Sequence, residues 1–225
     1  MSDTQLWSDS TDYMEGLLAP ADPVLDAVQQ AADDAGLPRI SLDPLQARML
    51  QILAGAIGAR RILEVGTLAG YSGIHLARAL PADGRLVTLE IDDLHADVAL
   101  ANFGRAGLAG RVELRRGAAL DSMAALEAEG CEPFDMAFID ADKLNNVNYL
   151  NWAVAHSRPG ALIVIDNVVR GGQVATGSDE DPSVAGTRAA LRMAAEDGRL
   201  EATVLQTVGR KNFDGLCFIR VRSGQ

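Results

Sequence analysis

Polar side chains with oxygen donors end two apolar, strand-like segments in the second half of the sequence. Asp140 ends the segment 134–140, and Asp166 with Asn167 follows the apolar run 161–165. Two carboxylates and one amide, with no Cys or His nearby in sequence, suit a hard cation such as Mg²⁺. Adjacent parallel strands lie roughly 4.8 Å apart, so their ends can share one ion. The sequence therefore predicts a metal site of Asp140, Asp166 and Asn167; the alternative is that the two aspartates only cap helices.

Lys143 follows Asp140 by three residues. If a helix begins at this point, the lysine amine returns to the same edge of the sheet as the Asp140 carboxylate. A lysine beside a dication and partly removed from water can take a proton from an acceptor hydroxyl. We therefore predict Lys143 and Asp140 as the catalytic residues; the alternative is an ordinary solvated lysine.

A glycine-containing turn follows the first strand-like segment and spans residues 64–72, with the sequence EVGTLAGYS. Gly66 and Gly70 permit close approach of the backbone to a ligand. The dinucleotide fingerprint GxGxxG is absent because Leu68 stands two residues after Gly66. A ligand without a pyrophosphate is therefore favoured, with Ser72 able to donate to its carboxylate near a helix start. The alternative is a tight turn and a simple cap.

Glu90 ends the next strand-like segment, 26 positions after Glu64. A carboxylate at this place in a nucleoside-binding α/β sheet can accept hydrogen bonds from both ribose hydroxyls. The sequence therefore predicts a nucleoside site at the strand ends, although a solvated strand end would also explain a glutamate here.

These residues need a parallel sheet to bring them together, and the hydrophobic pattern predicts one. Short apolar strands alternate with helical segments, which is typical of an α/β fold with helices on both faces of the sheet. The last two strands follow a helix near 184–197 with no helix between them, which indicates an antiparallel hairpin. The predicted strands are 61–65, 85–90, 111–115, 134–140, 161–166, 200–208 and 213–222, the last two joined through 209–212, and the helices between the first five are 72–80, 93–106, 119–129 and 143–156.

The N-terminal region differs from this pattern. Residues 1–20 form a polar lead-in, a helix covers 22–35, and another begins with Asp43 as N-cap and Pro44 in its first turn. Residues 168–184 are expected to form a long loop. The length predicts one domain over 1–225, with a helical region at 1–57 and an α/β core at 58–225.

Composition narrows the function classes. With 48% hydrophobic and 23% charged residues, the chain is globular rather than disordered. The net charge of −11 argues against nucleic acid as a partner, because phosphate neutralisation needs a basic face. The two cysteines form no CxxC pair, which favours a reducing cytoplasm over a disulfide framework. No apolar run reaches the roughly 20 residues needed to span a bilayer, so no membrane association is expected.

The motifs E-V-G-T-x-x-G-Y-S and T-L-E resemble those of class I S-adenosylmethionine methyltransferases. F-I-D-A-D-K and I-D-N resemble, more narrowly, the cation-dependent O-methyltransferases of the catechol and caffeoyl-CoA type, over roughly residues 38–220. The resemblance implies a Rossmann-like, mostly parallel seven-stranded sheet with a C-terminal antiparallel hairpin, a homodimer, and the same three metal ligands. It implies cofactor contacts from Leu42 through its backbone, Glu64, Gly66, Thr67, Ser72, Glu90, Ala118 and Asp140.

The sequence departs from the family at Asn146, where an aromatic residue is frequent, and the departure indicates a more polar wall around the acceptor. Our leading hypothesis is Mg²⁺-dependent, or other divalent-cation-dependent, methyl transfer from S-adenosylmethionine to a hydroxyl of a small acceptor with vicinal oxygens, catechol-like or a hydroxamate. The alternatives are a metal-independent methyltransferase on the same fold and a non-catalytic nucleoside-binding module. A nicotinamide dehydrogenase is disfavoured because both GxGxxG and a Tyr-x-x-x-Lys pair are absent.

Overall fold

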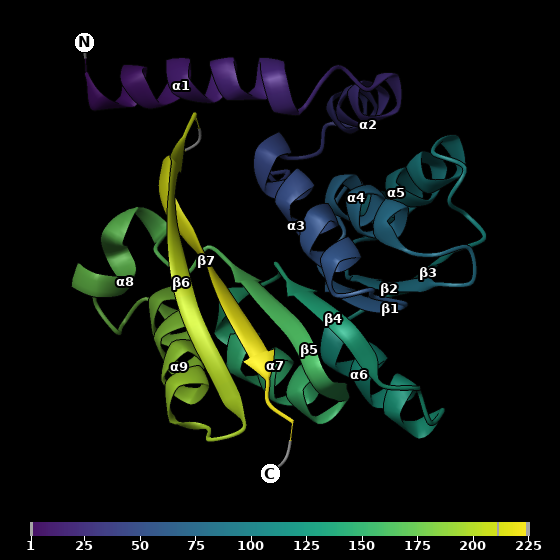
Figure 1. Ribbon diagram of the computed structural model, residues 1–225, viewed down its shortest axis with the longest axis vertical. Helices are drawn as coiled ribbons and strands as arrows, with labels where there is room; N and C mark the ends of the chain where they lie inside the picture. The colour runs from purple at the N-terminus through teal and green to yellow at the C-terminus, as the bar shows by residue number, and fades with distance from the viewer. Residues whose placement is uncertain (1, 211, 224–225) are drawn as a thin grey trace. The chain divides into compact units, whose positions relative to one another are not determined.

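The computed structural model describes residues 2–210 and 212–223. The chain divides into two compact units, one of residues 18–135 and one of residues 1–17 together with 136–225. The described strands form a seven-stranded mixed sheet with helices around it, so the predicted α/β fold is confirmed (Figure 1). That residues 1–225 make a single domain, with the boundary near residue 57, stays a prediction.

In the unit of residues 18–135, strands alternate with helices. The strand order is β3-β2-β1, and both strand pairs are parallel, with Ile62 of β1 opposite Leu86 of β2. Strand β1, with the sequence RILEV, is buried from Ile62 to Val65, as expected for a strand covered on both faces. The elements are α2 (Pro23–Asp34), α3 (Pro44–Ala56), β1 (Arg61–Val65), α4 (Tyr71–Ala79), β2 (Arg85–Glu90), α5 (Asp93–Arg105), β3 (Val112–Arg116) and α6 (Ala119–Ala128).

The second unit carries the antiparallel part of the sheet. Its strand order is β4-β5-β7-β6, and β7 runs antiparallel to both β5 and β6, which confirms the predicted C-terminal hairpin. Lys211, in the predicted connection, lies outside the described residues. The elements are α1 (Asp3–Leu18), β4 (Phe134–Ile139), the 3₁₀-helix η1 (Lys143–Asn145), α7 (Asn146–Ala155), β5 (Ser157–Asp166), η2 (Arg170–Gly172), α8 (Gln173–Thr176), α9 (Pro182–Glu196), β6 (Leu200–Gly209) and β7 (Asn212–Val221).

Three helices begin at Asp–Pro pairs. Asp22, Asp43 and Asp181 are the N-caps of α2, α3 and α9, and each side chain accepts a backbone amide in the first turn of its helix. The following proline supplies a preset φ and lacks an amide that the helix start would leave unpaired. Local sequence therefore determines where these helices start, as predicted for Asp43.

Within the helical region predicted for residues 1–57, most of the polar lead-in at residues 1–20 forms one regular helix, α1. Its residues Asp12 and Glu15 bind Arg210 of the β6–β7 hairpin, and Figure 1 shows α1 running past the tip of that hairpin. These contacts join residues far apart in sequence, so local patterning gave no sign of them. None of the described helices, α1 included, is long and apolar enough to cross a membrane.

Other boundaries differ by a few residues. The predicted helix at 143–156 opens with the 3₁₀-helix η1 before α7, and β5 begins at Ser157, four residues early. The expected loop at 168–184 contains the short helices η2 and α8. Arg188 of α9 holds this segment by donating to the carbonyl oxygens of Val174 and Gly177.

His75 of α4 makes stability depend on pH. Burial, followed by the charges of Arg78 and Arg48, lowers the pKa of His75 to about 4. The His75 side chain therefore takes up a proton near pH 6.5 in the unfolded chain but only near pH 4 in the folded chain. The contribution of neutral His75 to the free energy of unfolding is complete above pH 6.5 and is lost as the pH falls towards 4. We expect wild type to lose about 1–3 kcal/mol relative to His75→Asn between pH 6.5 and 4.

Urea unfolding at several pH values measures this difference. The asparagine amide can still donate to Gln51, which accepts from His75 Nδ1 at 2.8 Å if that nitrogen carries the proton. Parallel pH profiles for the two proteins would contradict the assignment.

Candidate active site

Glu64 is fully buried at the end of β1, and hydroxyl groups satisfy its charge. Ser72 Oγ donates to Glu64 Oε1 at 2.6 Å, and Thr88 Oγ1 donates to Oε2 at 2.7 Å. Hydrogen bonds to an ionised carboxylate are about twice as strong as neutral ones. Glu64 therefore ties the first turn of α4 to β2. Thr88 was not predicted, although its place two residues before Glu90 puts both side chains on the same face of β2.

The turn after β1 needs its two glycines. Gly66 and Gly70 have φ values of 96° and 84°, in the left-handed region that favours glycine. A Cβ at Gly70 would stand 3.0 Å from the ring of Phe103, and Asn102 Nδ2 donates to the Ala69 carbonyl at 2.9 Å. Helix α5 therefore braces the turn from behind, which the spacing of the glycines alone could not indicate.

Glu90 lies at the end of β2 with only 6% of its surface exposed. Its Oε2 accepts the amides of Thr67 at 3.1 Å and Leu68 at 2.8 Å, and Oε1 accepts the amide of Asp92 at 3.0 Å. Oε1 is also 3.6 Å from His95 Nδ1. The carboxylate thus holds the glycine turn in place, and among the described residues Oε1 keeps capacity for one further donor.

Two of the residues predicted to contact the cofactor, Leu42 and Ala118, take no part in these side-chain hydrogen bonds. Leu42 stands just before α3 with a buried side chain. Ala118 is the N-cap residue of α6, and the preceding Gly117 donates its amide to the Glu90 carbonyl at 2.9 Å. This hydrogen bond of Gly117 places Ala118 at the C-terminal ends of β2 and β3, where the sequence predicts a ligand.

In the second unit, Lys143 and Asp140 form a close pair. Lys143 Nζ lies 2.8 Å from Asp140 Oδ1, and Lys143 is only 7% exposed. Asp142 caps η1 by accepting the Asn145 amide, and it also accepts the Tyr149 hydroxyl. Lys143 is therefore not the solvated lysine of the alternative interpretation, because both its amine and its backbone are held.

Gly186 of α9 allows this segment to sit where it does. A Cβ at Gly186 would stand 2.1 Å from the Lys143 carbonyl oxygen and 2.9 Å from Leu144 Cα. Those are backbone atoms, so no rotamer change could relieve the clash. The position of Lys143 thus depends on a glycine 43 residues away, which sequence reasoning missed.

Asp166 is buried beside these charges. Burial, and then the negative charge of Asp140, raise the pKa of Asp166 to about 7, while the Lys143 ammonium opposes the shift. Asp166 Oδ1 accepts the amide of Asn167 at 2.7 Å, and Asn167 adopts a left-handed φ of 58°. A cation would relieve the crowding of the carboxylates, so these oxygen donors fit a hard metal ion.

The predicted metal ligands include an amide as the third donor. The described residues contain no cluster of three or more His, Cys, Asp or Glu side chains suited to a metal ion. The two carboxylates, Asp140 and Asp166, thus need Asn167 or other oxygen donors to complete a coordination shell.

Asp214 of β7 was not predicted, and it contacts the same region. Its Oδ2 accepts from Asn167 Nδ2 at 3.3 Å, and its Oδ1 accepts the amides of Val169 and Arg170 at 3.1 and 2.9 Å. The antiparallel pairing of β7 with β5 brings it there, with Leu216 opposite Asp166. No local motif around residue 214 signals this role.

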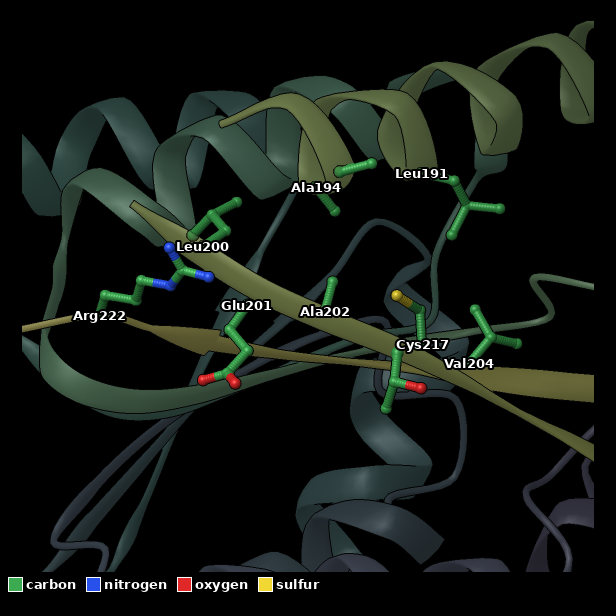
Figure 2. A pocket seen from close by; sticks show the side chains of 10 residues that line it. Leu191, Ala194, Leu200, Glu201, Ala202, Val204, Cys217 and Arg222 are labelled. Atoms are coloured by element: carbon green, nitrogen blue, oxygen red, sulfur yellow. The ribbon is translucent and has the colours of Figure 1, made fainter. Parts of the chain in front are cut away.

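A cavity of about 540 Å³ lies elsewhere in the second unit, between α9 and the strands β6 and β7. Figure 2 shows Leu191 and Ala194 of α9 above Ala202 and Cys217, and burial raises the pKa of the Cys217 thiol to about 11. None of the predicted catalytic, cofactor or metal residues lines this cavity.

Comparison with known proteins identifies the family. A family model described as O-methyltransferase matches residues 18–220. The catechol O-methyltransferase of Mycobacterium tuberculosis is 50% identical over 210 residues, covering 93% of this chain and 94% of that protein.

Solved structures agree with this match. The O-methyltransferase from Bacillus cereus in complex with SAH has a TM-score of 0.95 at 47% identity, covering 97% of this chain and all of that one. The O-methyltransferase TomG from Streptomyces achromogenes, in complex with SAM, has a TM-score of 0.95 at 42% identity, covering 99% and 100%. The chain therefore belongs to the O-methyltransferase family, and it is an enzyme that transfers a methyl group to oxygen.

Proposed function

We propose that this O-methyltransferase uses S-adenosylmethionine and a divalent cation, Mg²⁺ by preference, to methylate a hydroxyl of a small acceptor with adjacent oxygens. The observation that carries the proposal is the ion pair between the buried Lys143 and the partly exposed Asp140, whose charges act on the buried carboxyl of Asp166. The name of the Mycobacterium tuberculosis relative supports a catechol-like acceptor, and a hydroxamate offers the same pair of oxygens.

The cofactor would be held by the residues around the glycine turn, together with Asp140. Glu90 would accept a ribose hydroxyl, because Oε1 retains a lone pair while Oε2 keeps the turn in shape. Ser72 donates its proton to Glu64 and not, as the sequence predicts, to a ligand carboxylate, so its oxygen would offer lone pairs to the amino acid part of the ligand. Glu64 would then act on the cofactor through Ser72. Backbone or packing contacts with the cofactor would come from Leu42, Gly66, Thr67 and Ala118.

Asp140, Asp166 and Asn167 would hold the cation. A bound Mg²⁺ would supply a Lewis acid that orients two acceptor oxygens and increases the acidity of one hydroxyl. Lys143 would take the proton of that hydroxyl, and Asp140 orients the amine from 2.8 Å. The protein would thereby align the acceptor oxygen with the activated methyl group.

Membership of the O-methyltransferase family excludes two alternatives, the non-catalytic nucleoside-binding module and the nicotinamide dehydrogenase. The metal-independent methyltransferase remains the second candidate, and activity in excess chelator distinguishes it. Asn146 is fully buried, and neither amide atom finds a hydrogen-bond partner among the described residues, so the amide is free to bind a polar group that comes next to it.

Replacing Glu90 with alanine should weaken S-adenosylmethionine binding by about 10- to 150-fold, or roughly 1.5–3 kcal/mol. The substitution removes the ribose acceptor and also releases the amides of Thr67 and Leu68. Calorimetric titration with S-adenosylmethionine measures the effect. Asp93→Ala on α5, where the side chain is 84% exposed, is the matched loss of one charge and should bind normally. Unchanged affinity in Glu90→Ala would remove Glu90 from the cofactor site.

Asp166→Ala and Asn167→Ala should each raise the Mg²⁺ concentration needed for half-maximal rate, by at least about tenfold for Asp166→Ala. Asp166 should matter more because it contributes charge as well as an oxygen. Initial rates against Mg²⁺ concentration provide the measurement, with melting curves to check folding. Asp179→Ala, whose side chain is 68% exposed, is the control.

Two results of these rate measurements would contradict the proposed metal site. If both variants keep the wild-type half-saturating Mg²⁺ and full rate, the cation binds elsewhere. Full wild-type activity in excess chelator would favour the metal-independent mechanism.

We also propose a homodimer and a cytoplasmic location, neither of which bears on the chemistry. The dimer follows from the family resemblance, and sedimentation analysis tests it. The location follows from the two cysteines, which occur as free thiols.

A further inference from the structure

Asp214 connects β7 to the turn that follows β5. Its Oδ1 accepts the amides of Val169, Arg170 and Gly215, at 3.1, 2.9 and 2.8 Å. A backbone bond from the Val168 amide to the Gly215 carbonyl, at 3.0 Å, reinforces the connection. One carboxylate therefore organises the backbone of the whole turn.

This turn is in a conformation that needs such support. Asn167 and Arg170 have φ values of 58° and 53°, where residues other than glycine are uncommon. Gly215 permits the close approach, because a Cβ there would stand 2.7 Å from Val169 Cγ2. The hydrogen bonds to Asp214 compensate for the unfavourable backbone, so the turn depends on this residue.

The same carboxylate sets the orientation of the Asn167 amide. Asn167 Nδ2 donates to Asp214 Oδ2 at 3.3 Å. An ionised carboxylate can only accept hydrogen bonds, so it selects the amide rotamer with nitrogen toward Asp214 and oxygen away from it. Only the oxygen of an asparagine amide can bind a hard cation.

We propose that Asp214 is a positioning residue for the metal site: it holds the turn and fixes the Asn167 amide so that its Oδ1 serves as a cation ligand. This inference rests on the proposed function, which assigns the cation to Asp140, Asp166 and Asn167. Asp214 is poorly suited to be a ligand itself, because Oδ1 already accepts three amides and Oδ2 accepts the Asn167 amide.

The test uses Asp214→Asn, which changes only the group that faces Asn167. The new side-chain oxygen can still accept the three backbone amides, but its nitrogen would oppose the Asn167 nitrogen. The Asn167 amide should then flip and present its nitrogen to the cation. Mn²⁺ binding to the full chain, measured by the electron paramagnetic resonance of free Mn²⁺ without cofactor or acceptor, should weaken by about 10- to 100-fold.

A second variant exchanges the two groups and keeps the net charge of the site. In Asp214→Asn/Asn167→Asp the carboxylate and amide exchange places, so the amide at 214 donates to one oxygen at 167 and leaves the other for the ion. We expect this exchange to restore most of the Mn²⁺ affinity. The control is Asp179→Asn, an exposed carboxylate in the same unit, which should bind Mn²⁺ as wild type does.

Each outcome distinguishes the inference from the function on which it rests. Normal Mn²⁺ affinity in Asp214→Asn, or no recovery of affinity in the double variant, overturns the positioning role. The proposed metal site is still supported in that case, provided that the wild-type protein binds Mn²⁺. If the wild-type protein binds no Mn²⁺, or if its Mn²⁺ binding persists in Asp166→Ala, both the metal site and the positioning role are wrong. Calorimetry with S-adenosylmethionine should give unchanged affinity in Asp214→Asn.

Discussion

Replacing Lys143 with alanine should lower kcat by about 10²- to 10⁴-fold, the usual contribution of a general base. The amine lies 2.8 Å from Asp140 and is almost fully buried, so no solvent-exposed group can easily replace it. Affinity for S-adenosylmethionine should stay near the wild-type value, because the hydrogen bonds of the glycine turn do not involve Lys143. Steady-state rates at saturating Mg²⁺ and calorimetry with the cofactor give the two measurements.

Lys143→Arg distinguishes a base from a structural charge. Arginine keeps the positive charge next to Asp140 but does not lose its proton in proteins, so it cannot act as a base. We expect Lys143→Arg to retain a near-normal melting temperature and still lose most of kcat. Near-normal turnover in either variant would remove Lys143 from the chemistry.

Gly186→Ala should cost about 3 kcal/mol or more, the upper end of overpacking effects, and lower Tm by roughly 6–12 °C. The added methyl would meet the carbonyl oxygen of Lys143 at 2.1 Å, so α9 or η1 must move. Because η1 carries Lys143, we also expect kcat to fall in the fraction that remains folded. Thermal melting and steady-state kinetics on the same preparation measure both effects.

Gly104→Ala is the matched control. Gly104 lies within α5, and a Cβ there would meet nothing within 4 Å. Alanine in a helix interior is favoured over glycine by roughly 0.5–1 kcal/mol, so this variant should melt at or above the wild-type temperature. A Gly186→Ala protein as stable and active as Gly104→Ala would mean that α9 does not constrain η1.

Much of the fold could be predicted because its information is local. Strands β1 and β2 match their predicted bounds, since each is a short apolar run limited by an arginine and a glycine or glutamate. The start of α3 follows from Asp43 and Pro44, which form a cap without help from the rest of the chain. Such signals act within a few residues, where a pattern in the sequence corresponds directly to a hydrogen bond.

The supporting contacts of the candidate site could not be predicted for the opposite reason. Asp214 meets Asn167 only because β7 pairs with β5, and Gly186 meets Lys143 only because α9 packs on η1. Sequence patterns identify the polar residues at strand ends, but the neighbours that orient them come from distant elements. The buried hydrogen bond from Thr88 to Glu64 is a further case, because it depends on the register of β1 with β2.

The link between α1 and the β6–β7 hairpin has a consequence for folding during synthesis. Arg210 Nε lies 2.6 Å from Asp12, and its Nη2 lies 2.6 Å from Glu15, so α1 binds a residue that is synthesised 198 positions after Asp12. At about 5–20 residues per second, α1 waits roughly 10–40 s for that partner. Residues 18–135 are continuous in sequence and can begin to fold in the interval, before the hairpin that binds α1 has been made.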